Sequence, residues 1–238
     1  MTDRQPMDPT EAFAELSRIK LSETDVDGVL KKIAELAERT IPGSDQVSVT
    51  LVPGKGAYTA TYTGDVALAL DEIQYQDGSG PCLDAAKSGD SLSLPDMSTE
   101  RRWPRFAARA LEVGIHSSMS MGLPIQENVG GALNIYAVKP DTFDRDAIIL
   151  AQTFAGYAAV ALANAHLYDV TATLAQHMQA AMESRAVIEQ AKGIVMGERR
   201  CTADEAFRIL SKLSQDSNRK VRDVAAALVD RAQQTPGS

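Results

Sequence analysis

Two kinds of hydrophobic pattern divide the chain. Over most of its length apolar residues recur every three or four positions, which predicts helices, whereas short stretches of the first half alternate apolar and polar residues, which predicts strands. The helical stretches of the first half are Thr10–Lys20, Asp25–Arg39, Val66–Tyr75 and a stretch from Arg101 to Gly114. The alternating stretches are Gln46–Val52, Tyr58–Tyr62, Ser91–Leu94, Ser117–Pro124 and Gly130–Val138.

Short turns join two pairs of these strands. Pro53–Gly56 and Gln126–Asn128 are glycine-rich or polar, as the turns of β-hairpins are. We expect about six strands arranged in hairpins with flanking helices. Such a domain is an antiparallel α+β fold rather than a doubly wound one.

One long helix is expected after the sheet. Between Pro140 and Pro236 there is no proline, and between Tyr157 and Lys192 there is no glycine, so nothing in that span obliges a helix to break. A seven-residue repeat runs through it: Val160, Leu167, Leu174, Ala181, Ile188 and Val195, with Ala163, Val170, His177, Ser184 and Ala191 three places later. The repeat predicts a coiled-coil connector over residues 160–182 and a parallel homodimer through the helix around Val160–Val195. The alternative is a helix that lies on its own domain.

The end of the chain predicts a small three-helix bundle. Thr202 and Glu205 form a capping box for a second helix. That helix is expected to turn Ala206, Ile209, Leu210 and Leu213 inward. Ser217–Asn218 is expected to cap a third helix, Arg219–Ala232, before a loose tail at 234–238. A bundle of this size has little core of its own and gains from attachment to the long helix.

Composition fits a globular protein with two modules. The 238 residues are 44% hydrophobic and 24% charged, and no run of about 18 apolar residues or secretory leader is evident, so we expect a cytoplasmic protein without a membrane segment. Cys82 and Cys201 have no metal-ligand spacing, which favours a reducing compartment. The net charge of -8 divides unevenly, with 10 Lys and Arg against 8 Asp and Glu from Thr171 onward, a net of +2, which leaves -10 for residues 1–170. This asymmetry predicts modules with different partners.

Candidate chemistry in the first module is sparse. The glycine-rich segment Asp77–Ala86 lacks the Lys-Ser/Thr of a phosphate loop, so a tight turn is favoured over an anion site. Cys82 begins a short helix, where a lowered thiol pKa would suit a redox sensor, but a buried packing role is favoured. Trp103 is either an anchor on the sheet or one wall of a ligand pocket, and packing is favoured. An enzyme with Cys82 as nucleophile and His116 as base lacks a third orienting group, and His116 is favoured as structural.

The segment Ser184–Met196 carries two different faces. On a helix Arg185, Lys192 and Arg199 lie along one side, while Ile188, Ala191 and Val195 mark a side for burial. Taken alone this is typical of a solvated amphipathic helix, with Arg185 pairing with Glu189 four residues on.

Four blocks of the first module form a recognisable set: Gly78–Ala85, Arg102–Pro104, Gly130–Ala137 and Phe143–Asp144. Together they resemble GAF sensor domains of actinobacterial response regulators. The resemblance covers residues 25–167, after an N-terminal segment 1–24. It implies a sensing fold built on a central sheet, for a small-molecule ligand or a redox signal, and such domains usually do no chemistry. No Cys-His dipeptide offers a bilin attachment site, and the sequence leaves the ligand and any cofactor unknown.

Several separate blocks at the end of the chain occur in a recognisable order: Ala181, Ser184–Met196, Asp204–Phe207, Leu210 and Asn218–Ala225. They resemble the ANTAR domain, the helical RNA-binding module of bacterial antitermination regulators, here expected at 178–233. The resemblance implies recognition of paired RNA stem-loops in nascent transcripts, and hence a transcription antiterminator rather than an enzyme.

The residues of this second module are compatible with RNA as the partner. Arg185 and Lys192 share a face, and Gly193 permits close backbone approach. Arg219, Lys220 and Arg222 form a second cationic cluster near the start of the third helix. A DNA-binding transcription factor that uses this third helix for recognition stays the alternative, although no convincing helix-turn-helix turn is present.

Overall fold

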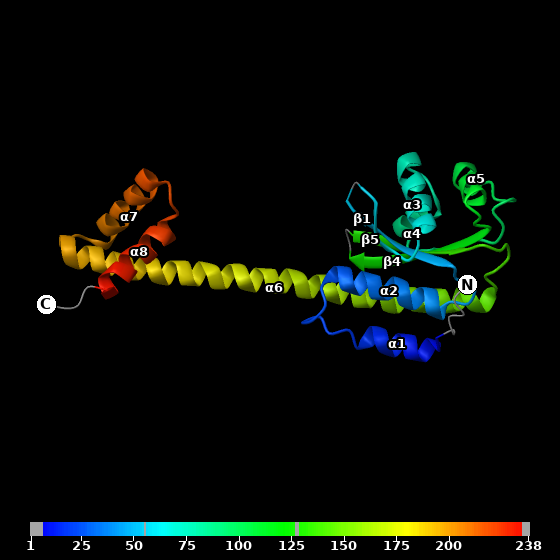
Figure 1. The fold of residues 1–238 in the computed structure, drawn as a ribbon, viewed down its shortest axis with the longest axis horizontal. Coiled ribbons are helices and arrows are strands. Elements are labelled where there is room, and N and C mark those ends of the chain that lie inside the picture. Colours follow the sequence, from blue (N-terminus) through cyan, green and yellow to red (C-terminus); the bar gives the residue numbers. More distant parts are fainter. Residues whose placement is uncertain (1–6, 55, 127–128, 235–238) are drawn as a thin grey trace. The chain divides into compact units, whose positions relative to one another are not determined.

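The computed structural model describes residues 7–54, 56–126 and 129–234. The chain forms two compact units, Met1–Asp169 and Val170–Ser238, and helix α6 (Arg145–Arg199) belongs partly to each (Figure 1). The centre of the expected turn at Gln126–Asn128 and most of the tail expected at 234–238 lie outside the described residues.

A five-stranded antiparallel sheet is the centre of the first unit (Figure 1). Its strands are β1 (Gln46–Pro53), β2 (Tyr58–Tyr62), β3 (Ser91–Leu94), β4 (Ser117–Gln126) and β5 (Val129–Ala137). Their order is β2-β1-β5-β4-β3, so the two predicted hairpins β1–β2 and β4–β5 form, and β1 pairs with β5. The antiparallel α+β class is confirmed, although the described strands number five rather than about six.

One face of the sheet is apolar. Alternate residues of the central strands, such as Val49, Met121 and Leu133, are buried on this face because a strand turns successive side chains to opposite sides. Helices α1 (Pro9–Ser17) and α2 (Val26–Thr40) and the first part of α6 supply the rest of this core. Phe13 of α1 stacks on Tyr157 of α6 with ring centroids 4.7 Å apart.

The other face of the sheet is polar but also buried. Ser48, Thr50, Ser120 and Asn134 point from the strands toward helices that cover them. These helices are α3 (Asp65–Asp77), α4 (Pro81–Ser88) and α5 (Pro104–Glu112), on the side opposite α2 (Figure 1). A polar layer therefore separates the sheet from α3 and α4.

The second unit is a three-helix bundle. Its core is formed by small and branched residues from the end of α6, from α7 (Ala203–Ser217) and from α8 (Val221–Gln234): Ala191, Val195, Ala206, Leu210, Ala225 and Val229. The predicted capping box of Thr202 and Glu205 is present.

Two predictions about the bundle are wrong. Ile209 and Leu213 are 36% and 47% exposed, because only one narrow side of α7, that of Ala206 and Leu210, meets the other helices. Asn218 does not begin the third helix: it ends α7 in the left-handed conformation, with φ 51°, a role in which asparagine is common. Helix α8 therefore starts at Val221 instead of Arg219, and the carbonyl of Lys220 accepts the first helical hydrogen bonds.

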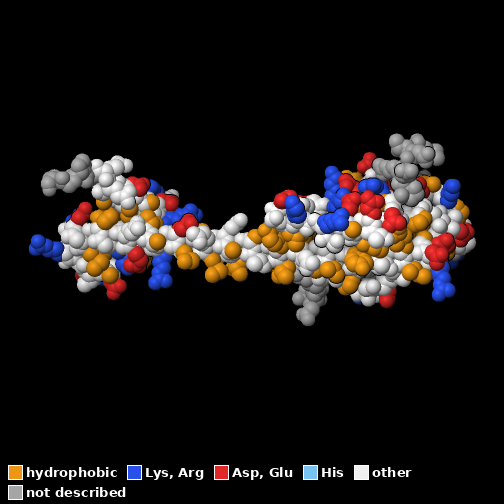
Figure 2. Space-filling model, turned by 90° about the horizontal axis from the view of Figure 1, so that it is seen from below, with side chains coloured by type: hydrophobic (Ala, Val, Ile, Leu, Met, Phe, Trp, Pro, Cys, Tyr) orange, Lys and Arg blue, Asp and Glu red, His pale blue; other side chains and the backbone are white. Residues whose placement is uncertain are grey.

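Helix α6 is unbroken over 55 residues, as the lack of proline and glycine predicted. Large apolar side chains remain exposed along its middle: Val160, Leu167, Leu174, Met178 and Met182, which we call the apolar stripe. Figure 2 shows hydrophobic side chains without Lys or Arg between them along the exposed middle of this helix. Ala191 and Val195, predicted as part of the dimer seam, are instead buried in the core of their own bundle, so an exposed seam ends before them.

Helix α6 is also long and apolar enough, by length and composition alone, to cross a membrane. In the most apolar 18-residue window of α6, 39% is buried inside the protein. Core helices of globular proteins have the same length and composition.

Candidate nucleic-acid interface and sensor core

Arg185 and Lys192, on the last part of α6, differ in their surroundings. Arg185 is exposed and forms no ion pair with any described residue. Lys192 has a side chain only 16% exposed, and its ammonium lies 3.0 Å from a carboxylate oxygen of Glu189. The expected pair between Arg185 and Glu189 is therefore replaced by one between Lys192 and Glu189. Arg185 is left with its charge uncompensated.

Gly193 lies in the open on α6. A Cβ built there would meet no atom within 4 Å, so packing inside the bundle does not require glycine. A glycine inside a helix costs about 1 kcal/mol relative to alanine. Beside it a groove of about 480 Å³ runs between α6 and α8, lined by Gln190, Gly193, Ile194, Val229, Ala232 and Gln233. The backbone at Gly193 is thus accessible to a binding partner.

The second cationic cluster lies where α7 turns into α8. Arg219 and Lys220 are in the turn, and Arg222 is in the first turn of α8. The Arg222 Nε lies 3.3 Å from the carboxylate of Asp223, and the Arg219 guanidinium donates to the Asp223 carbonyl oxygen at 3.2 Å. Lys220 is exposed and has no ion pair among the described residues. Of this cluster, Lys220 offers the least compensated charge.

The bundle core links the two cationic segments. Val187 and Ile188, just after Arg185, pack against the same core as Val221, which directly follows Lys220. Both cationic segments are thus anchored to one core, although they are far apart in the sequence.

Cys82 of the sensor unit is buried, and its surroundings oppose ionisation. Burial, and next the nearby Asp71, raise the pKa of the Cys82 thiol well above its ordinary value. The favoured packing role of Cys82 agrees with its burial, and the lowered pKa of a redox sensor is contradicted, because the side chain is enclosed by protein. The backbone N–H of Cys82 is also occupied: it donates to the side-chain oxygen of Gln74 at 2.9 Å.

Gly80 explains the glycine-rich turn before α4. A Cβ at this position would lie 2.2 Å from the side-chain oxygen of Gln74, the group that binds the Cys82 N–H. Gly78 ends α3 in the left-handed conformation, with φ 63°. The turn is thus built to dock α3 against the start of α4, which agrees with the prediction of a tight turn.

A buried acid, which the sequence did not single out, is the centre of the polar layer. Asp71 of α3 accepts hydrogen bonds from the hydroxyls of Tyr136 at 2.6 Å and Thr59 at 2.9 Å, and from the Asn134 amide at 3.3 Å. Burial outweighs these bonds and raises the pKa of Asp71 from 3.8 to about 6. Burial, and next Asp71, also raise the pKa of Tyr75. The signals in the sequence were an Asp inside the apolar stretch 66–75 and an Asn inside a buried strand.

Trp103 packs in a buried cluster of the sensor unit and also lines a cavity. Its side chain is buried, and its indole N–H donates to Asp84 at 3.1 Å, which joins two of the sequence blocks singled out above. The Arg102 guanidinium lies over the ring at 4.5 Å. Trp103 also lines a cavity of about 220 Å³ together with Asp77, Ser79, Arg102, Pro104, Arg105 and Phe106.

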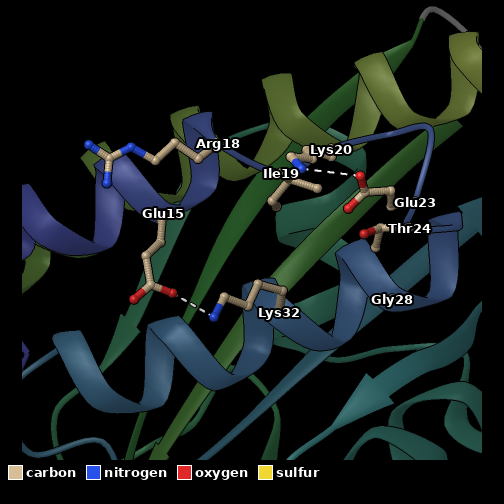
Figure 3. A pocket seen from close by; sticks show the side chains of 8 residues that line it. All are labelled: Glu15, Arg18, Ile19, Lys20, Glu23, Thr24, Gly28 and Lys32. Atoms are coloured by element: carbon tan, nitrogen blue, oxygen red, sulfur yellow. Dashed lines mark hydrogen bonds and ion pairs between the residues drawn. The ribbon is translucent and has the colours of Figure 1, made fainter.

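A larger open cavity of about 430 Å³ lies between α1, α2 and the loop that joins them (Figure 3). Its charges pair with one another: Lys20 with Glu23 at 3.1 Å, and Lys32 with Glu15. Arg18 points away from both pairs (Figure 3). Among the residues that the structure describes, no group of three His, Cys, Asp or Glu side chains is arranged to hold a metal ion.

Comparison with protein families identifies both units. The family model of the GAF domain matches residues 23–163, and that of the ANTAR domain matches residues 176–229. GAF domains are sensor domains, and ANTAR domains are RNA-binding domains of antitermination regulators; both are regulatory rather than catalytic. No curated protein matches the sequence.

Solved structures share the fold of the first unit. The phycoerythrobilin-bound GAF domain of a cyanobacterial phytochrome is 12% identical, with a TM-score of 0.52 over 68% of this chain and 97% of that one. Free methionine-R-sulfoxide reductase from Neisseria meningitidis is 15% identical, with a TM-score of 0.50 over 69% of this chain and 89% of that one. The chromophore-binding domain of a bacteriophytochrome from R. palustris is 13% identical, with a TM-score of 0.48 over 66% of this chain. The present chain spans only 61% of the length of that one. At these identities the likeness is one of fold.

The GAF match alone spans more than half of the residues, and the ANTAR match follows it on the separate helical unit. The chain therefore belongs to the GAF domain family and has the domain organisation of a GAF–ANTAR regulator.

Proposed function

We propose that this protein is a signal-responsive regulator of transcription termination that binds stem-loop RNA in nascent transcripts through its ANTAR bundle. The observation that carries the proposal is the uncompensated, exposed charge of Arg185 and Lys220 on a bundle that matches the ANTAR family. Such a protein works where transcripts are made, in the cytoplasm.

The proposed RNA contacts are Arg185, Lys192, Gly193, Arg219, Lys220 and Arg222. Arginine suits RNA because its planar guanidinium can bind phosphate in two places and stack on unpaired bases. The open backbone at Gly193 adds a surface that RNA can approach closely. Lys192 contributes only if RNA displaces Glu189, because the two side chains are paired in the free protein.

The charges of α8 favour RNA over the alternative of DNA read by this helix. Arg222 and Arg231 are offset by Asp223 and Asp230, so α8 carries no net charge. A recognition helix in a DNA groove depends on a cationic surface for most of its affinity. Arg185 and Lys220, whose exposed charges carry the proposal, lie outside α8, on α6 and in the turn before α8.

We further propose that the protein is a homodimer joined through the apolar stripe of α6. Between Arg145 and Arg185 the sequence contains no Lys or Arg, and Asp146, Asp169 and Glu183 are its only acids. A helix that faced water on this side would normally carry charged residues there. The seam runs from Val160 to Met182, since Ala191 and Val195 are buried in their own bundle.

Leu174→Asp tests the dimer. A charged residue in the seam should yield monomers, measured by sedimentation equilibrium of the full chain. Gln176→Asp is the matched control, because residue 176 faces the opposite side of α6 and is also exposed. Dimers that persist in Leu174→Asp would show that the stripe is not the interface.

The signal is proposed to enter through the GAF unit, as a small molecule or a redox change. The cavity beside Trp103 is the candidate ligand site. Trp103 is the only tryptophan, so its fluorescence is a direct readout for ligand screening.

The RNA proposal is tested by selecting hairpins with randomised loops on the purified full chain. Arg185→Ala with Lys192→Ala should weaken binding of the selected hairpin and reduce the salt dependence of log K by about 1 to 2, because each lost phosphate contact lowers it by about 0.7 to 0.9. The control is Arg208→Ala with Lys212→Ala, which removes the same charge from the exposed side of α7. Selection of no hairpin, or equal losses in both double variants, would contradict the assignment.

A further inference from the structure

Helix α3 is held on the sheet by polar contacts as much as by apolar ones. Four of its side chains are buried, two of them apolar and two polar: Ala67, Leu70, Asp71 and Gln74. Helix α2, on the opposite face of the sheet, buries six apolar side chains and one threonine (Figure 1). Because burial of apolar surface supplies most of the free energy that holds a helix in place, α3 is attached more weakly than α2.

The polar contacts of α3 form one chain of hydrogen bonds to the sheet. The Asp71 carboxyl group lies 2.9 Å from the Thr59 hydroxyl of β2, and that hydroxyl lies 2.8 Å from the hydroxyl of Tyr75. The Tyr75 hydroxyl lies 2.9 Å from that of Thr50 on β1. A hydroxyl can donate to either of its neighbours, so the chain is complete whether Asp71 is protonated or ionised. The two forms of Asp71 therefore differ mainly in charge.

No cation among the described residues pairs with ionised Asp71. Strands β1 and β2 contribute hydroxyl groups, and Arg105 of α5 pairs instead with Asp77, at 2.8 Å. Burial, and next the nearby Asp71, raise the pKa of two tyrosines and a cysteine around it, so these groups stay protonated at neutral pH. The ionisable groups that face Asp71 from α3, β5 and α4 are Glu72, Tyr75, Tyr136 and Cys82. Ionisation thus leaves a buried charge without compensation, which disfavours this form.

Separation of α3 from the sheet removes this cost. Asp71 is part of α3, so its carboxylate gains access to water when the helix moves away. The apolar core on the other face of the sheet is formed with α1, α2 and α6, and its described residues include none of α3. Helix α3 can therefore leave the sheet while the sheet and this core stay folded.

We propose that protonated Asp71 holds α3 on the sheet, that ionised Asp71 releases it, and that the GAF unit thereby senses acidification. The signal is the proton itself, and the response does not depend on the RNA binding proposed above. In the closed state Asp71 keeps its proton up to about pH 6, because burial raises its pKa, whereas in water it does so only up to about pH 4. Acidification from pH 7 to pH 5 therefore makes the released form about tenfold rarer.

Release of α3 also alters the candidate ligand site. Helix α3 ends at Asp77, which lines the cavity beside Trp103 and pairs with Arg105. A helix that leaves the sheet takes this wall of the cavity with it. The proton and a ligand in the cavity would thus act on the same movement.

The test is amide hydrogen exchange of the full chain at pH 5 and pH 7, followed by mass spectrometry, with labelling times scaled for the intrinsic exchange rate. In the parent at pH 7 the peptides of α3 should exchange faster than those of α2, because α3 opens without the rest of the unit. At pH 5 the opening of α3 should be about tenfold rarer. In Asp71→Asn it should not depend on pH and should be at least as rare as in the parent at pH 5. Glu72→Gln, which removes an exposed acid of the same helix, should keep the pH dependence.

Three outcomes would overturn the proposal. The first is a common exchange rate of α3 and α2 at pH 7, since Asp71 would then affect only the unfolding of the whole unit. The second is equal opening of α3 at pH 5 and pH 7 in the parent. The third is an unchanged pH dependence in Asp71→Asn. The first two comparisons use the parent alone, so they decide the matter even if the variant does not fold.

Discussion

Replacing the buried acid of the GAF unit should stabilise it at neutral pH. Asp71 is fully buried and receives hydrogen bonds but no ion pair from the described residues, and burial raises its pKa from 3.8 to about 6. The ionised form is therefore disfavoured in the folded state. Asp71→Asn removes the ionisable group and keeps a side-chain oxygen that accepts from the Tyr136 hydroxyl. The new amide can donate to the Thr59 hydroxyl. That hydroxyl is free to turn its own proton toward the Tyr75 hydroxyl, which lies 2.8 Å away.

The pH dependence follows from the raised pKa. Because the folded state holds this proton up to about pH 6 and the unfolded state only to about pH 4, the parent loses stability as pH rises between these values. A shift of about two units corresponds to about 3 kcal/mol, and an imperfect hydrogen bond of the new amide offsets about 1 kcal/mol of this. Asp71→Asn should thus be about 1 to 3 kcal/mol more stable than the parent at pH 8. The advantage should disappear below about pH 4.

Urea unfolding at several pH values, followed by Trp103 fluorescence, measures this difference. Trp103 is the only tryptophan and is buried in the same unit, so it reports on the unit that contains Asp71. Glu72→Gln is the control, since it removes an exposed acid next along the same helix and should change stability little at any pH. A difference between Asp71→Asn and the parent that is the same at pH 4 and pH 8, or a less stable variant at pH 8, would refute the reasoning.

Two further expectations concern Gly193 and the cysteines. Gly193→Ala should raise the unfolding free energy of the bundle by up to about 1 kcal/mol, because a Cβ has open space there. The same variant should bind the selected hairpin more weakly if RNA approaches this backbone. Unchanged RNA affinity in a stabilised variant would remove Gly193 from the interface. In the native protein at pH 8 an alkylating reagent should modify Cys201 well before Cys82, because Cys82 is buried and its pKa is raised. Mass spectrometry measures the rate of modification of each cysteine, and equal rates would contradict this expectation.

The sequence by itself determined most of the local structure. Alternation of apolar residues gave the strands, the three- to four-residue spacing gave the helices, and the lack of proline and glycine after Tyr157 gave an unbroken α6. These signals come from residues close together in the sequence. They predict secondary structure correctly where tertiary contacts do not oppose the local preference of the backbone. The prediction that Asn218 would begin a helix failed because the same residue can equally end one in the left-handed conformation.

The tertiary structure decided which side chains are compensated, buried or exposed. The seven-residue repeat treats Leu174 and Val195 alike, but packing buries Val195 in the bundle and leaves Leu174 at the surface. Likewise Arg185 and Lys192 look equivalent in the sequence. In the structure Glu189 forms its ion pair with Lys192, and Arg185 remains available to a binding partner. The polar layer around Asp71 joins residues as far apart as Ser48 and Asn134, and no local pattern records such a contact. Periodicity fixes the face that a residue occupies on its own element, whereas burial and charge compensation depend on what the rest of the chain brings to that face.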